Sequence, residues 1–403
     1  MQRFEPKDER RDGVARKRDG RGDKRTGGEG RGGARARPGG SRDARPAKGQ
    51  DEAGRGRTRP TSASQAKTAA SEGKSARAIS QETPALAADA GPSVKRLDLP
   101  RPTGPRPKLA APAILTVKPD ETYGLLDTGD GEKLERYGPL TVRRPENQAI
   151  WPRRRTSSEW DGADAIFTGD TDEEGTGRWR FPAEPLGETW PLAYDGIAYH
   201  GRFTSFRHTG VFPEQAAHWS FLSEAIAGAG RPVRLLNLFG YTGLASLVAA
   251  RAGAEVTHVD ASKKAIGWAR ENQALAEMDD KPIRWICEDA VRYAEREVKR
   301  GSGYEAILLD PPKFGRGPKG EVWQLFEDLP YLLGLTRALL SDRPLFLILT
   351  AYSIRASFFS LGALMGESFR GLGGQIEAGE LLIEEEGEDP RLLSTSLFSR
   401  WTA

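Results

Sequence analysis

The feature that most constrains the fold is a set of short, almost wholly apolar runs in the second half of the chain, separated by segments long enough for helices. The runs span residues 234–238, 255–259, 283–286, 306–309 and 345–349. Strands that are apolar throughout, rather than alternating, are typical of a parallel sheet that is buried on both faces. Their alternation with helices predicts a Rossmann-like, doubly wound α/β fold. Two last strands, near 377–384 and 393–400, are expected to close the mostly parallel sheet with an antiparallel edge.

The chain before this sheet divides into two regions. Residues 1–100 hold 24 Lys and Arg against 14 Asp and Glu, and long stretches there have almost no large apolar side chain. Such a composition cannot bury enough surface to offset the entropy of ordering, so residues 1–108 are predicted to be a disordered basic tail. Residues 109–190 combine alternating strands, turn residues and aromatic clusters, which predicts a small β-rich accessory domain. Residues 191–403 then form the α/β domain.

Charge and cysteine content limit the function. The whole chain has a net charge of +3, so the positive charge is concentrated in the tail, which is either a solubiliser or a tether for RNA. The one cysteine, Cys287, excludes an intramolecular disulfide and a zinc-thiolate cluster, and we expect it to be structural and largely buried. The four histidines lack metal-ligand spacing. With no signal peptide and no membrane-spanning run, we expect a cytoplasmic protein without a metal.

Candidate site residues follow the apolar runs, because ligands of doubly wound sheets bind at the carboxyl ends of the strands. The loop 239–243 (Phe-Gly-Tyr-Thr-Gly) leads into a helix, where glycines let a ligand approach the backbone and free amides attract a carboxylate. Asp260 comes about 20 residues later, where a carboxylate can accept hydrogen bonds from ribose hydroxyls. Asp289 fits an adenine amino group, with Ala290 leaving room for the ring. Both aspartates could instead cap the helices that follow them.

The most specific motif is Asp310-Pro311-Pro312-Lys313-Phe314, after the fourth run. Two consecutive prolines fit neither a helix interior nor a central strand, so this loop is expected to be rigid. Three basic residues, Lys313, Arg316 and Lys319, predict a mobile loop that faces nucleic acid. The Gly-x-Gly-x-x-Gly pattern at 315–320 does not predict a dinucleotide site, because it lies in this loop and not at a strand-to-helix turn.

Together these motifs resemble the bacterial large-subunit ribosomal RNA methyltransferases of the cytosine-C5 and guanine-N7 group. The segment 207–215, followed by Trp219, resembles a part of these enzymes that helps to cover the cofactor. The resemblance implies a class I S-adenosylmethionine-dependent methyltransferase over about residues 194–403. The expected cofactor-binding residues are Gln215, Trp219, Asn237, Phe239, Gly240, Tyr241, Thr242, Gly243, Asp260, Ala261, Ser262, Asp289 and Ala290. The expected catalytic residues are Asp310, Pro311, Pro312, Lys313 and Phe314, and the expected nucleic-acid contacts are Lys313, Arg316 and Lys319.

One departure from this group concerns the acceptor. The cytosine-C5 enzymes carry a cysteine just after the fifth strand, because C5 is not nucleophilic until a thiolate adds to the base. The corresponding stretch, 350–353, reads Thr-Ala-Tyr-Ser. We therefore expect transfer to a base nitrogen of ribosomal RNA, with Asp310 and the proline carbonyls bonding the base and Phe314 stacking on it. Two alternatives stay open: an RNA-binding or ribosome-assembly factor that retains the pocket, and a methyltransferase acting on protein or a small molecule.

Overall fold

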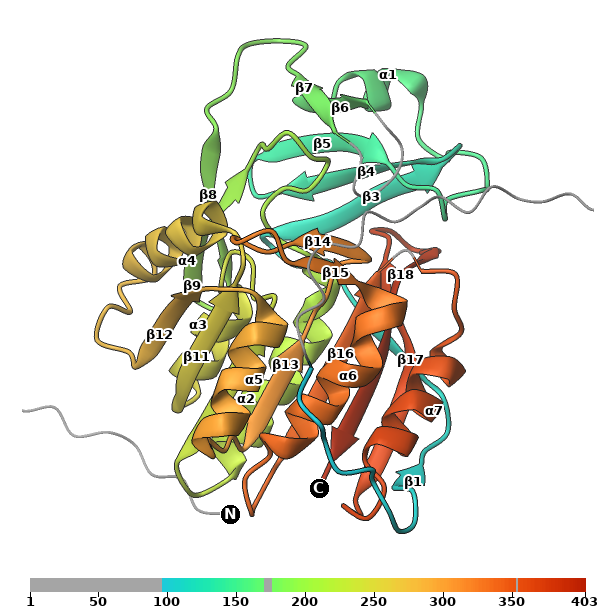
Figure 1. The fold of residues 1–403 in the computed structure, drawn as a ribbon. Helices are drawn as coiled ribbons and strands as arrows, with labels where there is room; N and C mark the ends of the chain where they lie inside the picture. Colours follow the sequence, from blue (N-terminus) through green and yellow to red (C-terminus); the bar gives the residue numbers. More distant parts are fainter. Residues whose placement is uncertain (1–95, 170–175, 353) are drawn as a thin grey trace, which may run out of the picture. The chain divides into compact units, whose positions relative to one another are not determined.

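A nine-stranded sheet dominates the part of the chain that the computed structural model describes, residues 96–169, 176–352 and 354–403 (Figure 1). The five apolar runs form its parallel strands: β10 (Val233–Leu238), β11 (Ala254–Asp260), β12 (Ile283–Cys287), β13 (Ala306–Leu309) and β16 (Phe346–Tyr352). Their order, β12-β11-β10-β13-β16, changes direction at β10. The predicted doubly wound α/β fold is confirmed, and the change of direction marks the edge where such sheets bind ligands.

Helices cover both faces of this sheet (Figure 1). Side chains from α2 (Ala216–Gly228) and α3 (Leu244–Arg251) share one core, and those from α5 (Ala290–Arg300), α6 (Leu325–Ala338) and α7 (Phe358–Ser368) share the other. Leu235 and Leu236 are neighbours on β10, yet each is 0% exposed and they belong to opposite cores. Burial on both faces explains why β13 is apolar at every position and β16 at nearly every position, since each such side chain contributes roughly 1.5–3 kcal/mol.

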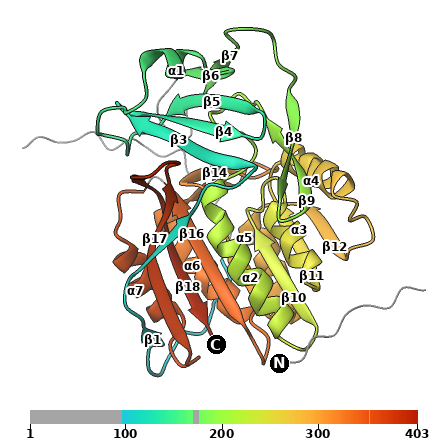
Figure 2. The same ribbon diagram turned by 180° about the vertical axis from the view of Figure 1, so that it is seen from behind.

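The far side of the sheet differs from the expectation. The late antiparallel strand is present, because β18 (Leu392–Thr402) lies antiparallel between β16 and β17 (Gln375–Glu384). However, β17 is not at the edge: β1 (Lys108–Leu109) and β2 (Ala113–Val117) pair with it in parallel (Figure 2). The alternation at 113–117 predicts a strand of the accessory domain, but β2 belongs to the main sheet. A local alternation identifies a strand but not its partner, which here comes from the other end of the chain.

The described end of the predicted tail is ordered. The backbone N–H of Leu97 donates to the Tyr331 hydroxyl on α6 at 2.7 Å, and Arg370 Nη1 donates to the Gly104 carbonyl at 3.0 Å. Leu97 and Leu99 pack against the core that α6 helps to form. The disorder predicted for residues 96–108 is therefore wrong, because two leucines find an apolar surface that composition alone does not reveal. Residues 1–95 lie outside the described part, and for them the basic tail stays a prediction.

A second sheet agrees with the expected β-rich region. Its strands pair in the order β3 (Tyr123–Gly129), β4 (Glu132–Tyr137), β5 (Leu140–Pro145), β6 (Ala165–Gly169) and β7 (Gly177–Arg180), with α1 (Ser157–Asp161) between β5 and β6. A separate hairpin follows, made of β8 (Thr189–Tyr194) and β9 (Ile197–Arg202). The turn expected over 127–131 narrows to Asp130-Gly131, whose φ angles of 52° and 77° suit a tight two-residue hairpin.

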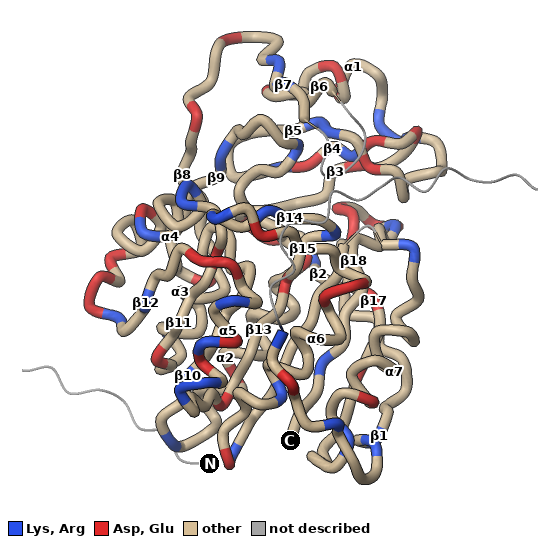
Figure 3. Tube along the Cα trace, in the orientation of Figure 1, with Lys and Arg blue, Asp and Glu red and all other residues tan. Residues whose placement is uncertain are grey.

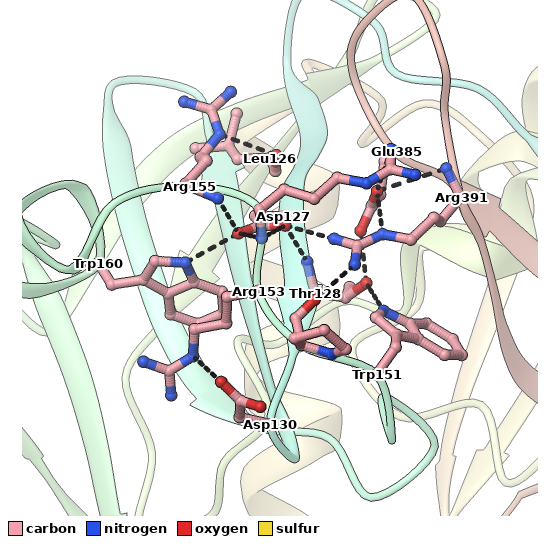
Figure 4. A network of polar contacts seen from close by, with 12 residues as sticks. Leu126, Asp127, Thr128, Asp130, Trp151, Arg153, Arg155, Trp160, Glu385 and Arg391 are labelled. Carbon is pink, nitrogen blue, oxygen red and sulfur yellow. Dashed lines mark hydrogen bonds and ion pairs between the residues drawn. The ribbon is translucent and has the colours of Figure 1, made fainter.

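A buried polar network joins this second sheet to the turn between β17 and β18 (Figure 4). Asp127, 1% exposed, accepts hydrogen bonds from the backbone N–H of Arg155 at 2.8 Å and from the Trp160 indole at 2.9 Å. Arg391 pairs with Asp127 and, at 2.8 Å, with Glu385. Since removing one member of such a network leaves a buried charge unpaired, the network fixes these two parts of the chain to each other.

Candidate cofactor and acceptor site

The loop that follows β10 has an unusual backbone. Phe239 and Tyr241 adopt φ values of 60° and 50°, a left-handed region that residues with a side chain rarely occupy. Gly240 is needed because a Cβ there would lie 2.3–2.5 Å from ring atoms of His258. Gly243, with φ of 85°, precedes α3 and provides no side-chain cap. Such strain collects at functional sites, and the uncapped start of α3 offers amide groups to an anion.

Asp260 lies at the end of β11 and is held against this loop. Its Oδ2 accepts the backbone N–H of Tyr241 at 2.9 Å, and its Oδ1 accepts that of Ser262 at 2.8 Å. The cap of α4 (Lys263–Leu275) is Ser262, whose hydroxyl accepts the Ala265 N–H at 3.2 Å. Asp260 is therefore not the cap, and burial raises its pKa. Each carboxylate oxygen keeps a further lone pair that can accept from a ligand.

Asp289 lies one strand further along the sheet and does cap a helix. Its Oδ1 accepts the Arg292 N–H at 2.9 Å at the start of α5, and burial raises its pKa. The carboxylate has lone pairs beyond the one used in the cap, so capping and ligand binding are compatible.

Cys287 corrects the expectation that the thiol is largely buried. It is exposed at the carboxyl end of β12, with Sγ 3.7 Å from the Ala261 carbonyl oxygen. β12 is an outer strand of the sheet, so its last residue is not covered by a neighbour.

Asp310 follows β13, on the other side of β10 from Asp260. Gln215 Nε2 donates to Asp310 Oδ2 at 3.2 Å and to the Tyr352 hydroxyl at 2.8 Å. Among the described residues, Oδ1 of Asp310 is buried without a hydrogen-bond partner. Burial, and then the negative charge of Glu214, raise the pKa of Asp310 to about 8. The site thus contains a carboxyl group whose pKa is raised to about 8 and whose Oδ1 has no partner among the described residues.

A cavity beside Asp310 brings many of the predicted residues together. It is enclosed by α2, the 239–243 loop and the ends of β10, β13 and β16, and its lining includes Gln215, His218, Trp219, Asn237, Phe239, Gly240, Tyr241, Thr242, Asp310 and Thr350. Asp260, Ala261, Ser262, Asp289 and Ala290 lie outside this lining, at the ends of β11 and β12. The arrangement therefore has two parts: the cavity on one side of the loop and the two aspartates on the other.

Two predicted cofactor residues use their side chains within the protein. Asn237 Nδ2 donates to Ser246 Oγ at 3.0 Å, and the Thr242 hydroxyl donates to the Gly210 carbonyl at 2.7 Å. The bond from Thr242 ties the cofactor loop to the segment 207–215.

Sequence reasoning missed two lining or adjacent residues, His218 and Tyr352. Tyr352 ends β16, and its ring centroid lies 5.1 Å from that of Phe212. Its position at the end of the fifth apolar run is the signal that could have identified it. Ser353, the last residue of that stretch, lies outside the described part of the chain.

The segment after Asp310 is a hairpin rather than the loop expected there. β14 (Phe314–Arg316) pairs antiparallel with β15 (Val322–Gln324), and the Trp323 indole donates to the Pro312 carbonyl at 2.7 Å. The Pro312 carbonyl, expected to bond a base, is thus engaged by Trp323, since the hairpin folds back on the loop. Phe314 is 42% exposed, and the Arg316 guanidinium lies 5.8 Å from its ring centroid.

The basic residues of the hairpin, Lys313, Arg316 and Lys319, are all exposed. The acidic residue between the strands, Glu321, pairs with Arg292 of α5 at 2.8 Å. Elsewhere in the described chain basic and acidic residues are both scattered along the trace (Figure 3). The exposed face of the hairpin therefore combines three cations with an aromatic ring, a combination that suits nucleic acid.

Residues 96–169, 176–352 and 354–403 contain no group of three or more His, Cys, Asp or Glu side chains arranged to hold a metal ion. Within the same residues, every helix is too short or too polar to cross a bilayer.

Comparison with known proteins identifies the family. A model of S-adenosylmethionine-dependent methyltransferases matches residues 165–341. The ribosomal RNA large subunit methyltransferase K/L of Shewanella sp. (strain MR-4) is 32% identical over 149 residues, which are 36% of this chain and only 20% of that protein's length. The ribosomal RNA large subunit methyltransferase K of Neisseria meningitidis is 26% identical over 253 residues, 60% of this chain and 68% of the relative. The crystal structure of the SAM-dependent methyltransferase from Agrobacterium tumefaciens is 58% identical, with a TM-score of 0.73, and the match covers 76% of this chain and 99% of that one. On this evidence the chain belongs to the class I S-adenosylmethionine-dependent methyltransferases.

Proposed function

We propose that this methyltransferase transfers a methyl group from S-adenosylmethionine to a nitrogen atom of a base in ribosomal RNA. The proposal rests mainly on Asp310, the first residue of the loop that follows β13. Its carboxyl group has one oxygen without a hydrogen-bond partner among the described residues and a pKa of about 8. A ribosomal RNA substrate would place the enzyme in the cytoplasm.

The cofactor fits the residues at the strand ends. Asp260 has lone pairs left after its two backbone bonds and would accept from the ribose hydroxyls, and Asp289 and Ala290 would border the adenine ring. Ala261 and Ser262 follow Asp260 and would lie along the ribose, and Gln215, Trp219 and the 239–243 loop would surround the rest. When bound, the cofactor supplies a methyl group on a positively charged sulfur.

Asp310 would orient the acceptor nitrogen. Gln215 holds one carboxyl oxygen, so the other is free to accept a hydrogen bond from an amino or ring N–H. A general base works best when its pKa is near the working pH, and a carboxylate with a pKa of about 8 can take the proton that the nitrogen loses as the new C–N bond forms. Transfer needs position and charge stabilisation more than covalent chemistry, which a rigid Asp-Pro-Pro loop provides.

The residue at the end of β16 supports nitrogen rather than cytosine C5 as the acceptor. Tyr352 belongs to the stretch 350–353, which corresponds to the place where the cytosine enzymes of the resembling group carry a cysteine, and its hydroxyl accepts a hydrogen bond from Gln215. The lone thiol, Cys287, is at the end of β12, with two strands, β11 and β10, between it and the strand that Asp310 follows. A thiolate attack at C6 therefore has no nearby nucleophile among these residues.

The exposed hairpin face and the names of the relatives support RNA as the substrate. Phe314 would stack on a base, while Lys313, Arg316 and Lys319 would contact phosphates. Both named relatives are ribosomal RNA large subunit methyltransferases.

The test is transfer of a labelled methyl group from S-adenosylmethionine to total RNA or to ribosomal proteins. We expect label in RNA, a rate that rises with pH through about 8, and a loss of more than about 100-fold in Asp310→Asn, since removing a general base costs about 10²–10⁴. Asp260→Ala should instead weaken cofactor binding, which calorimetry measures. Label in protein alone would favour the protein methyltransferase, and RNA binding without any transfer would favour the assembly factor.

A further inference from the structure

His218 has a conspicuous environment for a histidine that no step above uses. It lies on α2, is 2% exposed, and both of its ring nitrogens lack a hydrogen-bond partner among the described residues. Its ring packs edge-on against that of Phe398, with 5.2 Å between the centroids. A phenyl ring has no N–H, O–H or oxygen atom, so it offers the imidazole nitrogens no conventional hydrogen bond. A buried polar group without a partner destabilises the fold, so it points to a ligand that completes it.

The nitrogens belong to the cavity already described. His218 lines it together with Gln215 and Asp310. Of the other polar side chains there, Gln215 bonds Asp310 and Tyr352, Asn237 bonds Ser246, and Thr242 bonds Gly210. Among these side chains, atoms without a partner remain on His218 and on Asp310 Oδ1.

The sheet order separates the proposed adenosine contacts from the proposed acceptor contact. Asp260 and Asp289, the proposed adenosine contacts, lie on β11 and after β12, on one side of β10. Asp310, the proposed acceptor contact, lies after β13, on the other side. If the adenosine end lies over the first pair and the sulfur lies near Asp310, the amino-acid end must enter the cavity between α2 and the start of α3, where Leu244 and Ala245 also line the wall.

We propose that His218 binds the amino-acid end of S-adenosylmethionine, the group that carries an ammonium and a carboxylate. This inference rests on the proposed cofactor site and is independent of whether RNA is the substrate. A neutral imidazole donates from one nitrogen and accepts at the other, so it suits a group that offers both a donor and an acceptor. Burial, and then the charge of Arg400, lower the pKa of His218 to about 3, so the ring is neutral and is a binding group rather than a base.

The experiment compares ligands that do and do not carry the amino-acid end. Calorimetry measures S-adenosylmethionine, S-adenosylhomocysteine and 5′-methylthioadenosine, which lacks that end, on the full-length protein. We expect His218→Leu to lower the affinity for the first two ligands about 10- to 100-fold, as the loss of hydrogen bonds to charged groups predicts. Its affinity for 5′-methylthioadenosine should not change. His218→Gln, which keeps a donor and an acceptor, should recover much of the affinity.

Asp260→Ala is the matched control. It should lower the affinity for all three ligands by the same factor, because all three carry the adenosine end. Equal loss of all three ligands in His218→Leu would overturn the inference, since the ring would then serve only packing. Unchanged affinity for all three would overturn it as well, and would mean that the nitrogens bind only ordered water. If the wild type binds none of the ligands, the cofactor site itself fails; if binding follows the expected pattern but RNA stays unmethylated, only the proposed substrate fails. Melting temperatures of both His218 variants exclude unfolding as the cause.

Discussion

Asp310 should make the protein less stable as the pH rises, and replacing it should remove that effect. Its pKa is raised from an ordinary 3.8 to about 8 because the carboxyl is buried and lies near Glu214. An acid with a raised pKa in the folded state favours unfolding once the unfolded chain can ionise, so its cost begins above pH 3.8, grows with pH and levels off above about 8.

The magnitude follows from the distance between the two pKa values. Each pKa unit corresponds to about 1.4 kcal/mol, so Asp310 costs at most about 4 kcal/mol at pH 7 and less than half of that at pH 5. Asp310→Asn keeps the shape and can still accept the bond from Gln215, but it does not ionise. At roughly 2 °C per kcal/mol for a protein of this size, its melting temperature should exceed that of the wild type by up to about 8 °C at pH 7 and about 3 °C at pH 5.

The assay is calorimetric melting of wild type and variant from pH 5 to 9 without cofactor. Asp342→Asn is the matched control, because Asp342 is exposed. The difference in melting temperature between this variant and the wild type should not depend on pH. If Asp310→Asn does not raise the melting temperature, or if the increase does not grow with pH, burial of this carboxyl does not destabilise the fold and the reasoning is refuted. Together with the expected loss of transfer, the gain would show stability given up for function.

Three further predictions concern the cofactor, the thiol and the tail. The affinity for S-adenosylmethionine relative to S-adenosylhomocysteine, measured by calorimetry, should rise as the pH passes about 8, because only ionised Asp310 attracts the sulfonium; Asp310→Asn should make this ratio independent of pH. Cys287→Ser should retain methyl transfer in the labelling assay, since the exposed thiol lies away from the acceptor; loss of transfer with intact cofactor binding would revive a thiolate mechanism. Deleting residues 1–95 should flatten the salt dependence of RNA binding in a filter-binding assay and leave cofactor affinity unchanged, because this segment carries an excess of positive charge; an equal slope would make it only a solubiliser.

The central part of the sheet and its strand ends could be predicted because their signals are local. An apolar run such as 306–309 identifies a strand buried on both faces, and the residue that follows it, Asp310, must then lie at the ligand-binding edge. For the same reason the sequence places the loop 239–243 and Asp260 at this edge, as observed, while their contact with the cofactor stays a prediction.

What the sequence did not reveal depends on contacts between distant segments. β2 looks like any half-buried strand, and nothing in its residues names β17 as the partner. Residues 96–99 are ordered by α6, and the hairpin β14–β15 folds back through a bond from Trp323 to Pro312.

The hydrogen-bond partners of the side chains in the site could not be predicted from the sequence either. Asn237 was a reasonable cofactor residue by position, but its amide bonds Ser246, whereas His218 carried no motif and proved to be an unpartnered polar group in the cavity. Cys287 was expected to be buried because free cysteines usually are, yet it ends an outer strand of the sheet.

The most direct test of the account is the chemical identity of the methylated nucleoside. Ribosomal RNA from a strain that lacks the gene is incubated with labelled S-adenosylmethionine and the purified enzyme, digested, and analysed by mass spectrometry. If Asp310 promotes transfer to a base nitrogen, the digest contains a single class of labelled nucleoside with the methyl group on a base nitrogen, and Asp310→Asn lowers the label more than about 100-fold. A methyl group on cytosine C5, or undiminished labelling by Asp310→Asn, would contradict the account.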